Sequence, residues 1–184
     1  DNGVTNFHFE VTAEHLDEEM LEVLGSLRPG AVQLEIGVQT TNQRTLAEVG
    51  RPTDLAALRR VVERLGAAHN IHRHLDLIAG LPYEDYGSFG RSFDEVFRLA
   101  PEQLQLGFLK VLKGSRMEER AAEYGLLYTR EAPYEVLATR WLSYDEILRL
   151  KAVEEVLEMY YNSAQFTLTL PVLMAGRSPF RFFE

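Results

Sequence analysis

The chain has 184 residues, of which 46% are hydrophobic and 26% charged, an ordinary composition for one globular domain. Its formal net charge of -9 argues against nucleic acid or an anionic membrane surface as the main partner, because either would repel an acidic domain. It has no cysteine, which excludes disulfides, thiolate metal sites and cysteine nucleophiles.

The first two thirds of the chain alternate short apolar runs with helical patterns. An extended run near residues 4–11 precedes a helical pattern near 13–26, for which Thr12 is the expected cap. "AVQLEIGV" predicts the next strand, "NQRTLAEVG" a short helix, and "TDLAALRRVVERLGAAH" a second helix capped by Thr53 or Asp54. "NIHRHLDLIAGLP" predicts a third strand, "YGSFGRSFDEVFRLA" a helix, and "EQLQLGFLKVL" a fourth strand.

This order predicts an α/β fold with parallel strands, because the connections are too long for hairpins. Such units form an open sheet or part of a (β/α) barrel. Further on, "SRMEERAAEYG" predicts a helix, "LLYTREAPYEVLATRW" a loop, and "SYDEILRLKAVEEVLEMYYNSAQF" one long amphipathic helix, while the final "RSPFRFFE" is apolar without a pattern. We expect a partial barrel at 1–124 and a helical extension at 125–184 that packs on it.

Polar residues stand at the carboxyl ends of the predicted strands, where parallel α/β folds place ligand sites. They are Glu10, Gln39, Asp76 and Lys110. An unpaired polar group in apolar surroundings costs about 1–3 kcal/mol, so corresponding positions on four strands suggest a shared ligand. Carboxylates accept bonds from ribose hydroxyls or an amine, and Arg51 can bind a carboxylate through two hydrogen bonds. The set predicts a zwitterionic nucleoside or an amino-acid-like ligand.

Structural roles for these residues stay open. Glu10 can cap the following helix, Gln39 can satisfy nearby backbone groups, and Arg51 can be a solvated residue beside a helix. Lys110 can extend from its strand end into solvent. Asp76 lies among branched aliphatic residues in "LDLI" and therefore needs a partner.

Three histidines, His69, His72 and His74, suggest a metal site at first sight. In a strand His72 and His74 share a face, but His69 precedes the strand at a turn, so no third ligand is fixed. We favour a structural or substrate-facing role for these histidines. Trp141 is expected to pack on the long helix or to line a substrate mouth.

Two segments, "LEIGVQTTNQRTLAEVGR" and "HLDLIAGLPYED", resemble neighbouring strand regions of radical S-adenosylmethionine enzymes. In particular, they resemble the group that contains oxygen-independent coproporphyrinogen oxidase and the cobalamin-binding-domain enzymes. "QLQLGFLKVLKGSRM" and the helical segment after it are similar to the cobalamin-type branch. The resemblance covers nearly the whole chain and implies the third to sixth strands of a partial TIM-like barrel.

The resemblance implies that a set of residues binds S-adenosylmethionine: Glu10, Gln39, Arg51, Asp76, Gly80, Leu81 and Pro82. In the family's pattern, Gln39 and Asp76 would face the ribose, and Arg51 would bind the carboxylate. Glu10 would lie beside the methionine moiety or the ribose. The "GLP" segment would make backbone contacts toward the adenine.

The family's CxxxCxxC loop, whose thiolates hold a [4Fe–4S] cluster, is missing because the chain has no cysteine. The resemblance therefore implies the C-terminal portion of a longer Fe–S oxidoreductase, with the cluster loop and any cobalamin-binding domain upstream of Asp1. That parent would cleave S-adenosylmethionine reductively to a 5′-deoxyadenosyl radical that acts on an organic substrate. This portion alone would be inactive, and its exposed edge near residues 4–11 would favour self-association.

Two other functions stay open: a non-catalytic binding module derived from a barrel, and a barrel lyase that uses Lys110 or Lys113 as a Schiff-base amine. The module could bind a ligand or serve in interactions, whereas the expected partners of the enzyme are a small-molecule substrate and S-adenosylmethionine. The sequence contains no membrane-spanning apolar run and no recognisable signal peptide, so we expect a cytoplasmic protein.

Overall fold

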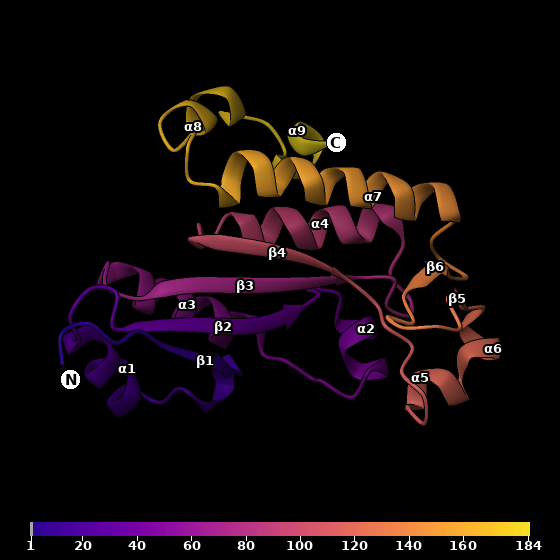
Figure 1. Cartoon of the computed structure of the whole chain (residues 1–184), viewed down its shortest axis with the longest axis horizontal. Helices are drawn as coiled ribbons and strands as arrows, with labels where there is room; N and C mark the ends of the chain where they lie inside the picture. Colours follow the sequence, from indigo (N-terminus) through magenta and orange to yellow (C-terminus); the bar gives the residue numbers. More distant parts are fainter. Residues whose placement is uncertain (1) are drawn as a thin grey trace.

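The computed structural model describes residues 2–184 and has a four-stranded parallel sheet at its centre. The strands are β1 (Phe7–Val11), β2 (Val32–Gln39), β3 (His72–Ala79) and β4 (Gln103–Phe108). They lie side by side in chain order, with helices in the connections between them (Figure 1). This arrangement confirms the predicted α/β fold, a partial barrel of parallel strands followed by helices.

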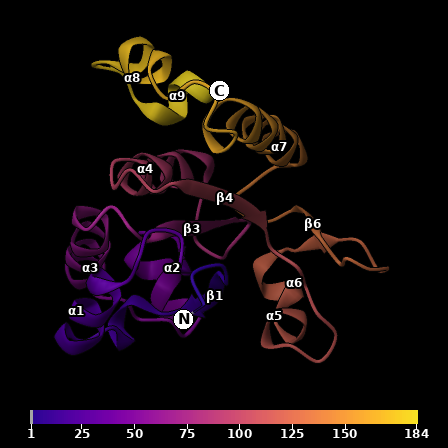
Figure 2. The same cartoon turned by 60° about the vertical axis from the view of Figure 1, so that its left-hand side comes forward.

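Three helices, α1 (Glu18–Ser26), α3 (Leu55–Ala67) and α4 (Tyr86–Phe97), lie on one side of the sheet (Figure 2). The strands contribute fully or nearly fully buried aliphatic side chains to the core: Leu34, Ile36, Leu75, Leu77, Leu104 and Leu106. These residues alternate with polar residues or glycine that point to the other side of the sheet. Burial of each one contributes about 1.5–3 kcal/mol, and a one-residue slip of a strand would expose its whole set.

The helix caps agree with the sequence in part. Asp54, one of the two predicted caps, accepts hydrogen bonds from the first turn of α3. The prediction that Thr12 caps a helix near residues 13–26 is wrong. Thr12 precedes only the short 3-10 helix η1 (Ala13–His15), and its side chain makes no capping bond. The chain then becomes extended, and α1 begins after Asp17, whose carboxylate accepts a hydrogen bond from the first turn.

The other elements are α2 (Gln43–Glu48), α5 (Arg116–Glu119), α6 (Ala121–Tyr124), β5 (Leu127–Tyr128), β6 (Val136–Ala138), α7 (Tyr144–Leu157), the π-helix η2 (Glu158–Asn162), α8 (Thr169–Met174) and α9 (Pro179–Phe183). The single helix predicted in "SRMEERAAEYG" is split into α5 and α6, because the backbone at Arg120 leaves helical geometry. The predicted long helix corresponds to α7 and η2, and it ends before Phe166.

The loop predicted at residues 126–141 is wrong in part, because β5 and β6 form an antiparallel pair there. The same segment also bonds to the chain that follows β4: Val136 N donates to Leu109 O at 2.8 Å, and Val111 N donates to Tyr134 O at 2.9 Å. The paired residues are far apart in the sequence. Local patterns therefore do not reveal this structure.

The last residues form α9, which the sequence pattern did not predict, and two of its aromatic rings pack on α4. Phe180 and Phe183 lie with their ring centroids 5.6 Å and 6.0 Å from that of Phe93. Buried residues from before and after residue 125 belong to one hydrophobic core. The division into 1–124 and 125–184 stays a prediction.

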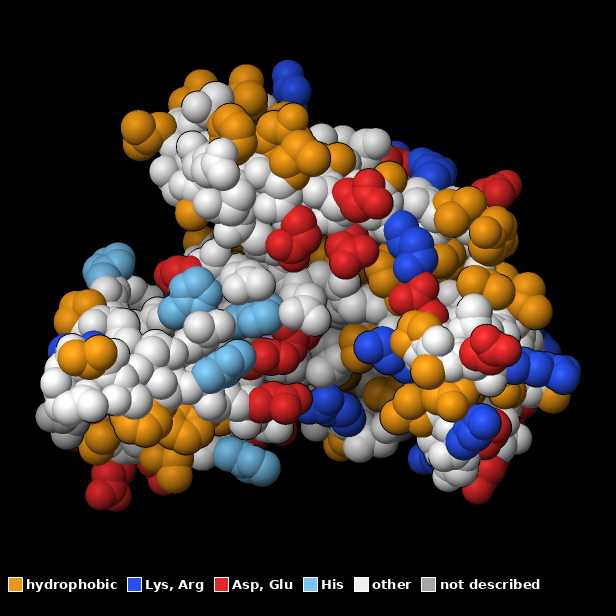
Figure 3. Space-filling view, viewed as in Figure 1, with side chains coloured by type: hydrophobic (Ala, Val, Ile, Leu, Met, Phe, Trp, Pro, Cys, Tyr) orange, Lys and Arg blue, Asp and Glu red, His pale blue; other side chains and the backbone are white. Residues whose placement is uncertain are grey.

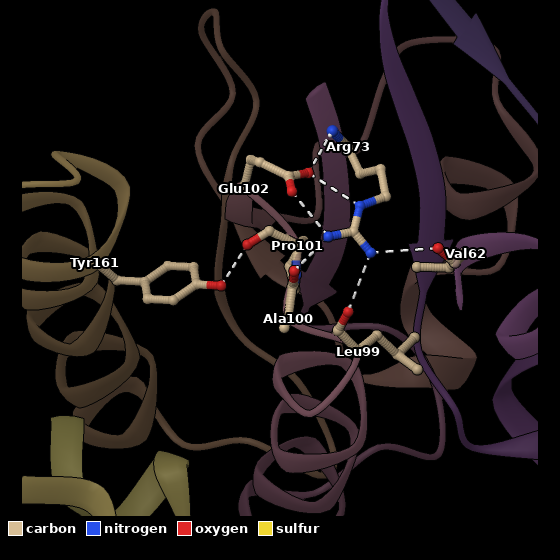
Figure 4. Close-up of polar contacts among 7 residues, drawn as sticks. All are labelled: Val62, Arg73, Leu99, Ala100, Pro101, Glu102 and Tyr161. Atoms are coloured by element: carbon tan, nitrogen blue, oxygen red, sulfur yellow. Dashed lines mark hydrogen bonds and ion pairs between the residues drawn. The ribbon is translucent and has the colours of Figure 1, made fainter. Parts of the chain in front are cut away.

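Near the amino ends of the strands, the buried side chain of Arg73 links β3 to α3 and to the segment that follows α4 (Figure 4). Arg73 donates to the carboxylate of Glu102 through Nε at 3.0 Å and Nη2 at 2.8 Å. Its remaining N–H groups donate to the backbone carbonyls of Val62, Leu99 and Ala100. Burial alone would raise the pKa of Glu102, but the hydrogen bonds and charge of Arg73 outweigh it and lower that pKa. The guanidinium is fully paired, so Arg73 has a structural role.

Within residues 2–184, no helix combines the length and the apolar character that a membrane span requires.

Candidate active site

The face of the sheet that points away from α1, α3 and α4 is polar. Strand register places Glu10, Glu35 and His74 in one row across β1, β2 and β3, and Gly37 beside Asp76 in the next row. Figure 3 shows histidine side chains gathered beside acidic side chains over the sheet, with basic side chains toward the strand ends. This face is the inner side of the partial barrel, where ligands bind in such folds.

Three of the predicted ligand residues, Glu10, Gln39 and Arg51, line one cavity of about 440 Å³. The cavity lies at the carboxyl ends of β1 and β2 and also includes Gly37 and His15. A volume of this size suits a ligand such as a nucleoside. Two of the four predicted strand-end residues, Glu10 and Gln39, therefore meet at one site with Arg51, whereas Asp76 and Lys110 do not line this cavity.

The backbone at Gln39 explains how its side chain enters this cavity. Gln39 ends β2 with a φ of 68°, in the left-handed region that a residue with a side chain rarely adopts. This turns its amide back over the strand, where a side chain at position 37 would collide with it. Gly37 thus leaves the space that Gln39 and the neighbouring guanidinium of Arg51 occupy.

Asp76 lies next to Gly37 in the adjacent strand, and its carboxyl is largely buried. Burial raises its pKa to about 7, and the charge and hydrogen bond of Glu35, then the charge of Glu10, contribute to the same shift. Asp76 Oδ1 lies 3.1 Å from His74 Nε2. Within the described residues neither atom has a hydrogen bond of acceptable geometry, and the same holds for Gln39 Oε1. Three buried polar atoms on the inner face are therefore available to a ligand.

His74 lies in the same row as Glu35 and is buried on the inner face. Burial lowers its pKa, and the negative charge of Glu35 partly opposes that shift. The carboxylate of Glu35 contacts His8 Nε2 at 3.1 Å and His74 Nδ1 at 3.9 Å. His72 shares the strand face with His74, as predicted from the period of two. Among the described residues, no group of three or more metal-ligating side chains is placed to hold an ion.

Glu84, which the sequence did not single out, holds the loop next to this cavity. Its carboxyl is fully buried and accepts hydrogen bonds from the hydroxyls of Thr40 at 2.5 Å and Ser92 at 3.1 Å. Burial raises its pKa to about 7, although these hydroxyl bonds oppose the shift. The network ties the residue after Gln39 to the loop after β3. In "YEDY" an acidic residue is typical of solvated loops, so the sequence carries no signal for this role.

The predicted "GLP" segment follows β3, and none of its residues lines the cavity. Gly80 has a φ of 93° and packs closely on Val136. Leu81 is buried in the core, and Pro82 O accepts a hydrogen bond from Thr45. Contacts from this segment to an adenine stay a prediction.

Lys110 is exposed directly after β4, and its backbone bridges to Glu135. Trp141 packs against Tyr83, with ring centroids 4.6 Å apart, at the loop that follows β3. The tryptophan therefore lies beside one of the strand-end loops and not only on α7. A Schiff-base role for Lys110 has no supporting contact among the described residues.

Comparison with solved structures finds similar folds in larger proteins. Coproporphyrinogen III oxidase (HemN) from Escherichia coli, described as a radical SAM enzyme, matches with a TM-score of 0.60 and 22% identity over 90% of this chain and 34% of that chain. Archaeal Elp3 from Methanocaldococcus infernus, with its N-terminus deleted, matches with a TM-score of 0.55 and 18% identity over 64% of this chain and 28% of that chain.

A third similar structure is the radical S-adenosylmethionine methyltransferase TsrM from Kitasatospora setae, with cobalamin and a [4Fe-4S] cluster bound. Its TM-score is 0.54, with 18% identity over 68% of this chain and 24% of that chain. At these identities the likeness shows a shared fold. The chain spans between 24% and 34% of the length of these structures.

Residues 122–184 match a family described as "Protein of unknown function (DUF4080)". No curated protein matches the sequence at a significant level.

Proposed function

We propose that this chain is the S-adenosylmethionine-binding portion of a radical S-adenosylmethionine Fe–S oxidoreductase. The observation that carries the proposal is the convergence of Glu10, Gln39 and Arg51 on one cavity at the strand ends, with Asp76 in the adjacent strand. The fold shared with HemN and TsrM supports it. The parent enzyme would act on an organic small-molecule substrate with S-adenosylmethionine as its partner.

The side chains in and beside the cavity match the chemical groups of S-adenosylmethionine. Arg51 can bind the carboxylate, and the carboxylates of Glu10 and Asp76 can offset the ammonium and sulfonium charges. The free Oε1 of Gln39 and Oδ1 of Asp76 can accept hydrogen bonds from ribose hydroxyls. Hydrogen bonds from the ribose would remove the free-energy cost of about 1–3 kcal/mol that each buried unsatisfied acceptor carries.

The [4Fe–4S] cluster does not fit this chain, because no residue in it can supply a thiolate. In the proposal, the cluster and its electron come from the rest of the parent enzyme, and this chain alone is inactive. A cobalamin-binding domain in the parent is a further part of the proposal, supported by the sequence resemblance to the cobalamin-type branch.

The chain's own contribution is to bind and orient. Arg51 would fix the amino-acid end, and Gln39 with Asp76 the ribose, so that the nucleoside's 5′ carbon is held in place over the inner face. The carboxylates of Glu10 and Asp76 would favour a sulfonium cation over its neutral cleavage products.

The proposal is tested in the parent protein extended upstream of Asp1, with its cluster reconstituted anaerobically. We expect Asp76→Ala and Gln39→Ala each to weaken S-adenosylmethionine binding by about tenfold in calorimetry, roughly 1.4 kcal/mol, without unfolding the protein. Glu63→Ala removes an exposed carboxylate from α3 and is the matched control. Unchanged binding in both site variants would mean that these residues only support the core.

Activity is measured in the same protein as 5′-deoxyadenosine formed from S-adenosylmethionine in dithionite. Formation that is lost in Asp76→Ala supports the proposal. An extended protein without cluster-binding cysteines that forms none would contradict it and favour a binding module.

A further inference from the structure

The inner face continues beyond the residues assigned to S-adenosylmethionine. Toward the start of the strands it carries His8 on β1, Glu35 on β2 and His74 on β3. The proposed function assigns no role to these three residues. The contacts of Glu35 with the two histidines join them into one group that ends beside Asp76.

One member of this group, His74, is buried, and its surroundings indicate that a ligand completes the group. The side chain of His74 is only 7% exposed, yet its Nε2 has no hydrogen bond of acceptable geometry within the described residues. An unsatisfied buried nitrogen costs about 1–3 kcal/mol, so a protein retains one where something binds. Glu35 is 26% exposed, which leaves its carboxylate reachable from the inner face.

The charges of this face select the kind of ligand. The residues of β1 to β4 that point inward include three carboxylates, Glu10, Glu35 and Asp76, and no lysine or arginine. A polycarboxylate or a phosphate ester would meet like charges here, whereas an amine would meet a carboxylate in a partly desolvated setting.

We propose that the inner face beside the S-adenosylmethionine pocket binds the organic substrate through a cationic nitrogen group, which pairs with Glu35 between His8 and His74. This inference rests on the proposed function and names the substrate class of the same site. Glu35 supplies the charge, and the histidines orient its carboxylate. The inward glutamines Gln33 and Gln105 provide hydrogen bonds for the remaining polar groups of the substrate.

The test uses the extended, cluster-reconstituted protein with two probes of similar length, 1,5-diaminopentane and glutarate. We expect the diamine to bind in calorimetry at millimolar concentration and glutarate not to bind. Glu35→Gln should weaken diamine binding by about tenfold and leave S-adenosylmethionine binding unchanged. Glu22→Gln, which removes an exposed charge from α1, should change neither and controls for the acidic surface as a whole.

Binding of glutarate, absence of diamine binding, or equal diamine binding by Glu35→Gln and the parent sequence would overturn the inference. Equal weakening of diamine and S-adenosylmethionine binding would also overturn it, because Glu35 would then belong to the nucleoside pocket. Failure of the proposed function would give a different result: S-adenosylmethionine binding would be unchanged in Asp76→Ala.

Discussion

Gln39 is held in a left-handed conformation, which costs a residue with a side chain on the order of 1 kcal/mol. Such strain persists only where the surroundings fix it. Here the next residue, Thr40, is bonded to the buried Glu84, and Gly37 leaves room for the returning side chain. The strain therefore lies at the wall of the candidate pocket, where it directs an amide into the cavity.

Gly37→Ala is expected to weaken S-adenosylmethionine binding by about tenfold while the protein stays folded. The added methyl group would push away the flexible end of Gln39, which it would overlap, and would meet Arg51 at an ordinary 3.7 Å. Gly107→Ala is the matched control, since its methyl group would meet Leu77 O at an ordinary 3.5 Å on the same face. Calorimetry and thermal unfolding of both variants test this; equal binding by the two would contradict it.

Glu84 should make stability depend on pH. Its pKa rises from 4.5 to about 7 on folding, so the folded protein holds the proton more tightly. The protonated Glu84 carboxyl therefore makes its full contribution to the free energy of unfolding below about pH 4.5. This contribution falls as the pH rises through about 7, by on the order of 3 kcal/mol. Chemical unfolding at a series of pH values measures the slope.

In Glu84→Gln this fall should be reduced, because an amide cannot ionise. Asp76, whose pKa is also raised to about 7, contributes a fall of the same sign, so adding Asp76→Asn should reduce the fall further. A Glu84→Gln protein with an unchanged pH profile would show that the buried carboxyl does not titrate in this range.

At the scale of elements, α9 joins the end of the chain to the barrel through α4. The ring of Phe180 lies against Gly90, and Phe180 N donates to the carboxylate of Asp94 at 2.7 Å. The contact requires the absence of a side chain at position 90. A short terminal helix is thus held by aromatic packing and not by its own length.

Gly90→Ala is expected to destabilise the protein by about 1–3 kcal/mol, because the methyl group would overlap the ring of Phe180. Gly87→Ala is the control in the same helix: its methyl group meets only ordinary contacts, and alanine's higher helix propensity should stabilise by up to about 1 kcal/mol. Urea unfolding of both variants gives the difference. Equal stabilities would mean that α9 does not pack as described.

At the scale of the whole molecule, the two edges of the sheet differ. The side-chain amide of Asn162 bonds to both N and O of Leu104, so η2 covers the edge of β4. On the β1 edge, Phe7 and Phe9 stack on each other and are 49% and 50% exposed. An open edge with exposed aromatic side chains is a surface for pairing with another strand.

We expect the chain by itself to self-associate through β1, with a mass that rises with concentration in light scattering. Phe9→Lys should reduce this association, because a charge on an edge strand opposes pairing. Leu127→Lys, at an exposed apolar position outside the sheet, is the control. A chain that is strictly monomeric at high concentration would contradict the prediction.

The sequence predicted the parallel sheet and the strand end at Gln39 well, for a local reason. Buried strands read as apolar runs, and a polar residue at the end of such a run stands out, as Gln39 does. The prediction that Asp76 also stands at a strand end is wrong, because β3 continues to Ala79. Contacts between distant segments had no such signal. The β5–β6 pair, the packing of α9 and the buried position of Glu84 depend on neighbours far away in the chain.

Residue type and short-range spacing were enough to predict the α/β fold, to single out Glu10, Gln39, Arg51 and Asp76 as candidates, and to show that the chain has no cluster ligands. The folded chain was needed to show that Glu10, Gln39 and Arg51 share a cavity and that Glu35 lies between two histidines on an acidic face. Strand register and the burial around it set those distances, and through them the pKa values, because both depend on which strands become neighbours.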